Sequence, residues 1–283
     1  TIPRPDGDAT LLLMPAWQDA AEKGYAGVKV VSVFPGNQAR GRPSVMGSYL
    51  LLAGDSGEPL AVLDGRVLTL WRTAAASALA ATFLARPDAR RMVMVGAGAL
   101  APRLITAHAA VRPIDAVVVW NRTRERAERL AAEFDRPGLA VATTDDLAGA
   151  VAEADIVSVA TMSPDPVVKG AWLKPGAHVD LVGAYTPAMR EADDAAIQRV
   201  RVFVDTRAGA LKEAGDIVQP MAAGVLKETD IAGDLFDLCR GTAKGRASST
   251  EITLFKSVGA AIEDLAAAVL VEERLEGDWS RGL

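Results

Sequence analysis

The first 85 residues alternate short apolar runs with polar turns. The apolar runs, each predicted as a strand, lie at 11–15, 28–34, 49–53 and 59–63. Consecutive strands joined by short turns favour an antiparallel or mixed sheet. The alanine-rich stretch 69–85 has high helix propensity and ends at Arg86-Pro87-Asp88. Because proline disfavours helical geometry in the residue before it, we place a domain boundary at Pro87.

From Arg90 to about Val204 the pattern changes to strands that alternate with helices. The predicted strands are 92–95, 117–120, 139–142, 155–159, 178–182 and 201–204, and the predicted helices include 99–111, 123–134 and 190–199. This alternation predicts an α/β fold with a doubly wound parallel sheet. Residues 205–249 follow no clear pattern, and 250–255 suggest a last strand. Apolar residues recur at helical spacing over 257–275, and we expect this helix to return to the first domain.

A glycine-rich turn follows the first strand of the alternating series. After the apolar Met92–Val95, Gly96-Ala97-Gly98-Ala99-Leu100-Ala101 matches the dinucleotide-binding pattern G-x-G-x-x-G/A. Gly96 permits the tight turn, Gly98 lets the backbone approach a pyrophosphate, and Ala101 permits close packing of helix on strand. The N–H groups at the start of the next helix favour an anion. Because the motif lies between a predicted strand and a predicted helix, we interpret it as a dinucleotide site.

Composition and charge exclude several classes of protein. Half of the 283 residues are hydrophobic, which is enough for one large or two moderate domains. The net charge of −5, without a basic run, argues against nucleic acid as a partner. The single cysteine, Cys239, excludes an internal disulfide and fits a reducing compartment, so we expect a cytoplasmic protein. His108 and His178 lie far apart in the sequence, so we expect no metal site.

The chain also shows no apolar run long enough to cross a bilayer and no signal-peptide pattern at its start. We therefore expect no membrane partner. The first residue is Thr1 instead of methionine, and we expect that a natural N-terminal segment is missing ahead of it.

The second strand of the α/β region ends in Asn121-Arg122-Thr123-Arg124. In NAD-binding units an acidic residue usually holds the ribose hydroxyls at this place. Here Asn121 takes that place, and Arg122 can pair with a 2′-phosphate, with Thr123 as hydroxyl donor and helix cap and Arg126 one turn further on. The alternative is an ordinary solvated helix start. We predict NADPH as the cofactor, with NADH bound more weakly.

Three basic residues of the first domain are candidates for anion binding. Arg4 lies between prolines, Lys29 lies inside the apolar run Val28–Val31, and Arg72 lies near a helix start. A cation inside an apolar strand costs free energy unless it is paired or faces a ligand. Lys29 therefore either points to solvent from a half-buried strand or meets an anion, and the residues themselves leave both interpretations open.

A set of motifs in fixed order carries a resemblance to one family. They are Val28-Lys29-Val30-Val31, Phe34-Pro35-Gly36-Asn37, Asp64-Gly65, Arg72-Thr73-Ala74-Ala75, Val95-Gly96-Ala97-Gly98, Ser257-Val258-Gly259 and Glu263-Asp264. Over nearly the whole chain these resemble the ornithine cyclodeaminase/mu-crystallin family. The resemblance implies a discontinuous α+β substrate-binding and dimerisation domain (1–87 and 256–283), a Rossmann NADP-binding domain (88–255) and a homodimer.

The resemblance also implies roles for individual residues. Arg4, Lys29 and Arg72 match positions that hold the substrate carboxylate, Lys29 and Arg72 are the candidate catalytic residues, and Ser44 matches a substrate-contacting threonine. Ala160, Thr161 and Met162 match the segment at the nicotinamide ribose, and the segment 256–259 closes over the nicotinamide. The complete set of expected cofactor-binding residues is Gly96, Ala97, Gly98, Ala99, Leu100, Asn121, Arg122, Thr123, Arg126, Ala160, Thr161, Met162, Ser257, Val258 and Gly259.

One departure from the family pattern narrows the set of reactions that we expect the protein to catalyse. Cyclodeaminases of this family have an aspartate after paired glycines that follow the fifth strand, whereas this chain reads Val182-Gly183-Ala184-Tyr185. Tyr185, which we place among the substrate-binding residues, cannot supply that negative charge near neutral pH because a tyrosine has a pKa of about 10. This difference and the predicted NADPH site both favour a net reductase.

We therefore predict an NADPH-dependent reductase of cyclic ketimine acids, namely Δ1-pyrroline-2-carboxylate and also Δ1-piperideine-2-carboxylate, which yields proline and pipecolate. Asp205, Glu213 and Asp216 are expected to be solvated or capping carboxylates. Three alternatives stay open: an amino-acid dehydrogenase of the alanine or arginine type, an ornithine cyclodeaminase, and a mu-crystallin-like protein that binds NADPH without turnover.

Overall fold

The computed structural model describes residues 1–4, 7–19 and 24–279, and the chain divides into two compact units. Unit 1 contains Thr1–Arg72 and Ala260–Leu283, and unit 2 contains Thr73–Gly259. The unit boundaries thus follow residues 72 and 259, compared with the predicted boundaries after 87 and 255. They differ because helix α1 (Gly65–Leu84) is continuous through the first boundary, and the side chains of its second half pack into the core of unit 2.

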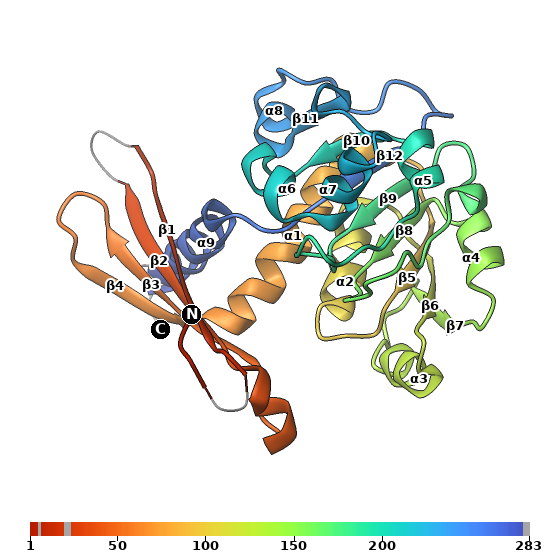
Figure 1. The fold of residues 1–283 in the computed structure, drawn as a ribbon. Helices are drawn as coiled ribbons and strands as arrows, with labels where there is room; N and C mark the ends of the chain where they lie inside the picture. Colours follow the sequence, from red (N-terminus) through yellow and green to blue (C-terminus); the bar gives the residue numbers. More distant parts are fainter. Residues whose placement is uncertain (5–6, 20–23, 280–283) are drawn as a thin grey trace. The chain divides into compact units, whose positions relative to one another are not determined.

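Unit 1 is built on a four-stranded antiparallel sheet (Figure 1). Its strands, in order of both sequence and space, are β1 (Thr10–Trp17), β2 (Tyr25–Val33), β3 (Val45–Ala53) and β4 (Pro59–Asp64). The short helix η1 (Pro35–Arg40) connects β2 to β3. Helix α9 (Ala261–Trp279) packs on one face of the sheet, where Leu265, Ala268 and Val269 bury Tyr49 and Leu51. The predicted return of the last helix to the first domain is therefore confirmed.

The opposite face of this sheet is apolar and exposed. Paired residues of neighbouring strands point to the same face, so Leu13 on β1 lies beside Val30 on β2. Trp17 is 69% exposed and Val62 is 76% exposed on the same face. We name this surface the outer sheet face; its exposed large side chains are Leu11, Leu13, Trp17, Val30, Met46 and Val62.

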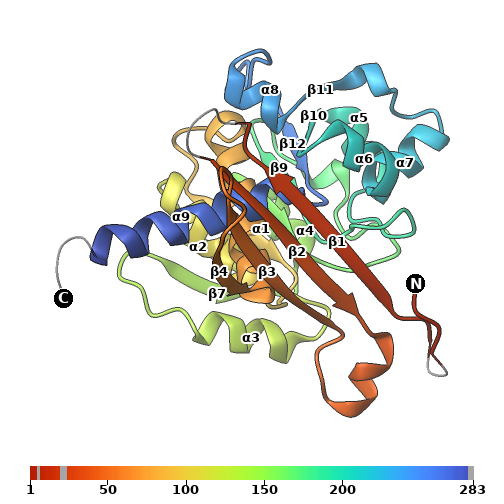
Figure 2. The ribbon, with the colours of Figure 1, turned by 90° about the vertical axis from the view of Figure 1, so that its left-hand side faces the viewer.

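Unit 2 is built on an eight-stranded sheet whose neighbouring strands are all parallel (Figure 1). Figure 2 is turned so that the other sheet, β1 to β4 of unit 1, faces the reader. The strands of unit 2 are β5 (Arg91–Val95), β6 (Ala116–Trp120), β7 (Ala140–Thr143), β8 (Ile156–Val159), β9 (His178–Leu181), β10 (Arg201–Val204), β11 (Ile231–Asp234) and β12 (Thr253–Lys256). Their spatial order is β11-β10-β12-β9-β8-β5-β6-β7. From β5 the chain first adds β6 and β7 on one side, and it then returns to place β8 on the other side of β5. Open α/β sheets bind their ligands at such a switch point, which here lies between β5 and β8.

Alternate residues of each central strand enter two different cores. Val93 and Val95 of β5 pack into one buried cluster, whereas Met92 and Met94 pack into the other. A sheet with apolar side chains on both faces must be covered on both faces, which explains the doubly wound arrangement. The helices of unit 2 are α2 (Ala101–Val111), α3 (Arg124–Ala132), α4 (Leu147–Glu153), η2 (Gly170–Trp172), α5 (Asp194–Arg199), α6 (Arg207–Glu213), α7 (Gly215–Ala222), η3 (Glu228–Asp230) and α8 (Leu235–Arg240). The predicted fold class is confirmed.

Two helix predictions need correction. The helix expected over 190–199 is only α5 (Asp194–Arg199), because the preceding segment is extended and Ala192 forms a bridge with Val168. The segment 205–249, which showed no pattern, contains α6, α7, β11 and α8. Each of these elements has four to eight residues, which is too short for a clear apolar period.

Helix α1 also bears on the expectation that no segment could cross a membrane. An 18-residue stretch of this 20-residue helix has a mean hydropathy of 1.4, so by length and composition it could span a bilayer. More than half of that stretch (56%) is buried within the protein, as in the core helix of a globular domain.

Candidate functional site

The glycine-rich turn at the end of β5 has the geometry that the sequence predicts. Gly96 adopts a φ of +105°, and a Cβ there would lie 2.5 Å from the carbonyl oxygen of Ala160. A Cβ on Gly98 would meet no atom within 4 Å, so the backbone is open on this side. Helix α2 begins at Ala101, two residues later than predicted, and no side chain caps its first N–H groups. At the helix start, Ala101 donates to the carbonyl of Gly98 (3.1 Å), Arg103 donates to the carbonyl of Leu100 (3.0 Å), and Pro102 has no N–H. The donors left for an anion are therefore the N–H groups of the turn itself, at Gly98, Ala99 and Leu100.

Asn121 connects the end of β6 to this turn. Its Oδ1 accepts a hydrogen bond from the backbone N–H of Ala97 (3.2 Å), and its Nδ2 donates to the carbonyl of Thr123 (2.8 Å). Thr123 stands at the N-cap position of α3, as predicted, but its side chain makes no capping hydrogen bond. Asn121 therefore holds two loops together at the place where an acidic residue would bind ribose.

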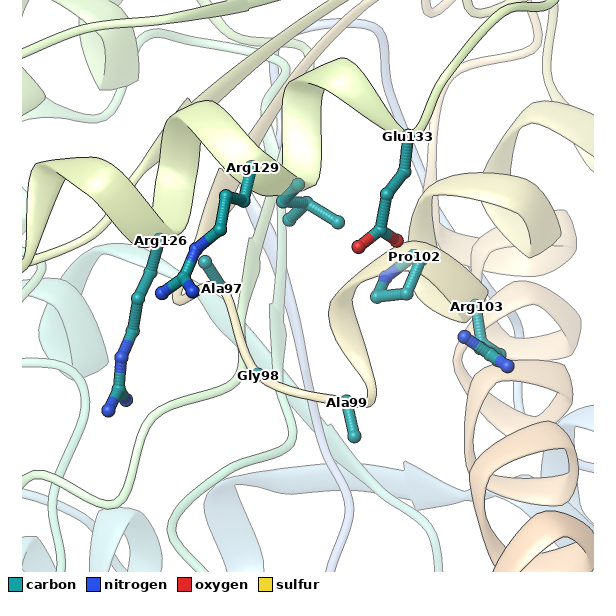
Figure 3. Close-up of a pocket in the computed structure, with 9 residues that line it drawn as sticks. Ala97, Gly98, Ala99, Pro102, Arg103, Arg126, Arg129 and Glu133 are labelled. Atoms are coloured by element: carbon teal, nitrogen blue, oxygen red, sulfur yellow. The ribbon is translucent and has the colours of Figure 1, made fainter.

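A pocket of about 410 Å³ adjoins the turn (Figure 3). In Figure 3 the side chains of Arg126 and Arg129, both on α3, extend from the helix on the side of the pocket that Ala97 lines. Arg126 is a predicted cofactor residue, whereas Arg103 and Arg129 were not identified from the sequence because arginines on exposed helix faces are common. Arg122 is exposed and does not line this pocket. The lining residues are Ala97, Gly98, Ala99, Pro102, Arg103, Arg126, Arg129, Leu130 and Glu133.

Buried Glu191 joins the loops that follow β8 and β9. Its Oε1 accepts hydrogen bonds from the backbone N–H (2.7 Å) and the hydroxyl (3.0 Å) of Thr161. Its Oε2 accepts from the backbone N–H groups of Gly183 (2.8 Å) and Ala184 (3.1 Å). Sequence reasoning missed Glu191, because its side chain contacts residues of separate loops.

Two buried charges lie beside Glu191. The Nζ of Lys256 is 3.1 Å from Asp216 Oδ2 and 3.6 Å from Glu191 Oε2, and all three side chains are fully buried. Burial raises the pKa of Glu191 to about 7; Lys256 opposes this shift and Asp216 adds to it. Asp216 is therefore not the solvated carboxylate that we expected, although its Oδ1 accepts from the backbone N–H groups of Glu191 and Ala192.

Asp205 caps the loop that follows β12, in agreement with the capping role expected for it. Its Oδ2 accepts from the backbone N–H groups of Val258 (2.7 Å) and Gly259 (2.6 Å) and from the hydroxyl of Ser257 (3.2 Å). Ser257 is buried, and Val258 and Gly259 are half-buried. Three loops at the carboxyl ends of parallel strands thus have their backbones bound by buried carboxylates.

In unit 1, Lys29 and Arg72 come together around one acidic residue. Lys29 Nζ is 2.7 Å from Asp264 Oδ2, and Arg72 Nε is 3.2 Å from Asp264 Oδ1. Arg72 Nη1 also donates to Glu263 Oε2 (2.7 Å). Lys29 is 2% exposed and Arg72 is 7% exposed, so neither points into solvent. The solvent-facing interpretation of Lys29 is wrong, because its strand position faces α9.

Burial and neighbouring charges in this cluster shift the pKa values of Lys29 and Tyr49. Burial and the neighbouring charge of Arg72 lower the pKa of Lys29, and Asp264 opposes the shift. Burial, followed by the charge of Asp264, raises the pKa of Tyr49 to about 12. Lys29 Nζ also donates to the hydroxyl of Thr69 (3.4 Å). The cluster therefore holds two cations against two carboxylates, with a tyrosine that stays protonated.

The remaining predicted residues lie in several places. The guanidinium of Arg4, which is exposed, lies over the ring of Phe34 at 5.8 Å. Ser44 is half-buried, and its carbonyl accepts from the N–H of Phe34 (2.8 Å). In unit 2, Tyr185 is 47% exposed and Met162 is 68% exposed. No cluster of three or more metal-ligating side chains occurs in residues 1–4, 7–19 and 24–279.

The donor set fits a dinucleotide. Gly98 leaves room for a pyrophosphate, the N–H groups of Gly98, Ala99 and Leu100 are left as donors, and the pocket beside them carries arginines. Together with the parallel sheet order, these features define the class of protein: a dinucleotide-binding oxidoreductase with a second, sheet-based unit. A sequence profile of the ornithine cyclodeaminase/mu-crystallin family matches residues 2–278, and the chain belongs to this family.

Two curated relatives illustrate the match. Protein SAR DEFICIENT 4 of Arabidopsis thaliana is 45% identical over 270 residues, which cover 94% of this chain and 83% of that protein. Delta(1)-pyrroline-2-carboxylate reductase of Paracoccus denitrificans is 43% identical and covers 95% of this chain and 84% of that protein.

Two solved structures share the fold. Delta(1)-pyrroline-2-carboxylate reductase of Thermococcus litoralis, in complex with NADH and L-proline, has a TM-score of 0.84 and 36% identity and covers 95% of this chain and 88% of that one. An archaeal alanine dehydrogenase dimer with bound NAD has a TM-score of 0.84 and 28% identity, with 95% and 86% covered. The predicted class, an NAD(P)H-dependent oxidoreductase that acts on CH–NH or C=N bonds, is confirmed.

Proposed function

We propose that this protein reduces Δ1-pyrroline-2-carboxylate to L-proline with NADPH, and that it also accepts the six-membered Δ1-piperideine-2-carboxylate and yields L-pipecolate. The observation that carries this proposal is the buried convergence of Lys29 and Arg72 on Asp264 in a chain whose relatives include named pyrroline-2-carboxylate reductases. The Thermococcus relative binds L-proline, which is the product of this reaction.

The substrate carboxylate would bind to donors that the ion pairs leave available. The Nε and Nη1 atoms of Arg72 face Asp264 and Glu263, which leaves Nη2 for the substrate. Lys29 carries three donors, two of which face Asp264 and Thr69. We propose that Arg4 supplies a further cation and that Ser44 and Tyr185 contact the ring. Orientation of the imine carbon by these residues is the main catalytic contribution of the chain.

The cofactor would lie along the carboxyl ends of β5, β6 and β8. The backbone N–H groups of Gly98, Ala99 and Leu100 would hold the pyrophosphate, with Ala97 beside them, whose own N–H is bound by Asn121. Ala160–Met162 and Ser257–Gly259 would hold the nicotinamide half, and Arg122, Thr123 and Arg126 would bind the 2′-phosphate. When bound, the nicotinamide supplies the hydride for the imine carbon. The nitrogen must also gain a proton, so a substrate that binds as the iminium requires no further acid from the chain.

We propose a homodimer that buries the outer sheet face. An antiparallel sheet with one free face normally presents polar side chains there, whereas this face exposes Leu13, Trp17 and Val62. Contiguous exposed apolar patches mark interaction sites in soluble proteins. The archaeal relative is described as a dimer. We also propose a cytoplasmic location, with the exposed Cys239 kept reduced.

The decisive test is a substrate panel with purified protein. We expect rapid NADPH oxidation with five- and six-membered cyclic imino acids and slow oxidation with pyruvate plus ammonia. Faster turnover of pyruvate plus ammonia would support the alternative of an amino-acid dehydrogenase. The similarity to the archaeal alanine dehydrogenase is the observation in favour of that alternative. Ammonia release from ornithine would support a cyclodeaminase, and tight NADPH binding without any turnover would support a binding protein.

A further inference from the structure

We propose that Glu191 is a positioning residue that shapes the nicotinamide half of the cofactor site without touching the adenosine half. This inference rests on the proposed use of a nicotinamide cofactor and concerns only residues of unit 2. Its basis is the set of four hydrogen bonds that Glu191 accepts from two separate loops, those after β8 and β9.

The loops concerned are in direct contact with one another. A Cβ on Gly183 would lie 2.0 Å from the carbonyl oxygen of Thr161 and 2.6 Å from Glu191 Oε1. A Cβ on Gly96 would similarly lie 2.5 Å from the carbonyl oxygen of Ala160. The glycine-rich turn, the loop after β8 and the loop after β9 are therefore closely packed at the carboxyl ends of the strands, and Glu191 binds the latter two loops.

The charge of Glu191 is held by buried groups on two other elements. Lys256, the last residue of β12, faces Glu191 Oε2 at 3.6 Å, and Asp216 on α7 faces Lys256 at 3.1 Å. Asp216 also binds the backbone N–H of Glu191 itself. Burial of three charges costs free energy, and their mutual attraction and the hydrogen bonds to the two loops offset that cost only while the loops keep this geometry.

Asp155, which lies at the other end of β8 from Thr161, offers a matched control for Glu191. It precedes β8, whereas Thr161 follows β8, so the two residues lie at opposite edges of the sheet. Like Glu191, Asp155 is a buried carboxylate that accepts from two backbone N–H groups, those of Arg90 and Arg91, and it pairs with the cations Arg86 and Lys174. Its loss should disturb the fold similarly, but at the edge where ligands do not bind.

The experiment compares Glu191→Gln with Asp155→Asn in the full chain. Affinities for NADH and NADPH are measured by fluorescence titration, affinity for ADP-ribose, which lacks the nicotinamide, is measured by calorimetry, and thermal unfolding is recorded for both variants. In Glu191→Gln we expect both nicotinamide cofactors to bind about tenfold or more weakly, with ADP-ribose changed less than about twofold. In Asp155→Asn we expect a lower Tm and unchanged affinity for all three.

Equal losses for ADP-ribose and NADH in Glu191→Gln, or no loss of either, would overturn the proposal. If Glu191→Gln does not fold, Gly183→Ala tests the same point, because its Cβ must separate the two loops; wild-type NADH affinity in that variant would also overturn it. A wild-type protein that binds NADH but does not reduce cyclic imino acids would refute the proposed substrate and leave this comparison valid.

Discussion

Lys29 Nζ lies 2.7 Å from Asp264 Oδ2, and both side chains are almost completely buried. The two residues come from opposite ends of the chain, one from β2 and the other from the first turn of α9. Their contact neutralises the lysine that the apolar strand carries and brings it to Arg72, which binds the other oxygen of the same carboxylate. The candidate substrate site of unit 1 therefore depends on α9.

The substitution Asp264→Asn should destabilise unit 1 and weaken substrate binding. It would leave Lys29 buried without its closest counter-charge, and removal of one partner of a buried pair typically costs about 3 kcal/mol of unfolding free energy. Urea unfolding checks the stability, and the KM for the cyclic imino acid, expected to rise, checks the site. Glu273→Gln on the exposed side of the same helix is the control, with a change below about 0.5 kcal/mol. Equal stability of the two variants would contradict the role of the pair.

Arg122→Ala and Arg126→Ala should weaken NADPH binding more than NADH binding. A charged hydrogen bond to the 2′-phosphate contributes roughly 1.5–3 kcal/mol, which corresponds to about ten- to 150-fold in affinity. Arg124→Ala is the control in the same turn, because Arg124 already pairs with Glu128 and Asp145. Equal losses of NADPH and NADH affinity in the first two variants would show that neither arginine reads the phosphate.

A charge on the outer sheet face should dissociate the proposed dimer. Leu13 is 63% exposed beside Val30, and Leu13→Glu would bring an unpaired carboxylate into an apolar interface. Sedimentation velocity should show a dimer for the wild type and a monomer for this variant. Phe236→Glu on α8, which also replaces an exposed apolar residue, should leave the dimer intact. A wild-type monomer, or a dimeric Leu13→Glu variant, would refute this interface.

The part of the folding stability that depends on His178 should fall with acid. Burial lowers the pKa of His178 to about 3, with Asp180 opposing and His108, Arg246 and Arg112 adding to the shift. The unfolded chain, with an ordinary His pKa of about 6.5, therefore binds one more proton between those two values. The contribution of His178 to the unfolding free energy should therefore decrease by up to about 1.4 kcal/mol per pH unit as pH falls from 6 to 4. Glu191, whose pKa burial raises to about 7, contributes in the opposite direction between about pH 7 and pH 4.5, so the His178 contribution is read as the difference between the wild type and a His178 variant.

The control for this pH dependence is His178→Asn, in which the contribution of His178 to the slope of unfolding free energy against pH should disappear. Burial acts to raise the pKa of Asp180, but its contacts with His108, Ser158 and His178 together outweigh burial and the pKa is lowered. The stability that Asp180 contributes is therefore lost only below its ordinary value of about 3.8. The window from pH 6 to 4 thus separates the two groups. An unchanged slope in His178→Asn, measured by urea unfolding at several pH values, would contradict the assignment.

The local pattern of residues was enough to predict the central part of the fold. Met92–Val95 read as a buried strand because all four residues are apolar, and Gly96 and Gly98 read as a turn. At Gly96 the fold requires glycine, because φ is +105° and a Cβ would meet Ala160, whereas the space beside Gly98 is open for a ligand. Short helices without a clear period, such as α6 and α7, could not be predicted in this way.

By itself, the sequence determined the α/β class and the dinucleotide turn, because both depend on residues that are close together along the chain. It left open whether the buried-strand cation Lys29 meets an anion or solvent. Only the tertiary structure decided which charges meet. It placed Asp264 against Lys29 and Arg72, and Glu191 against the loops of Thr161 and Gly183. These contacts join residues from distant elements, and a buried charge takes its partner from what the fold brings near and not from its neighbours in sequence.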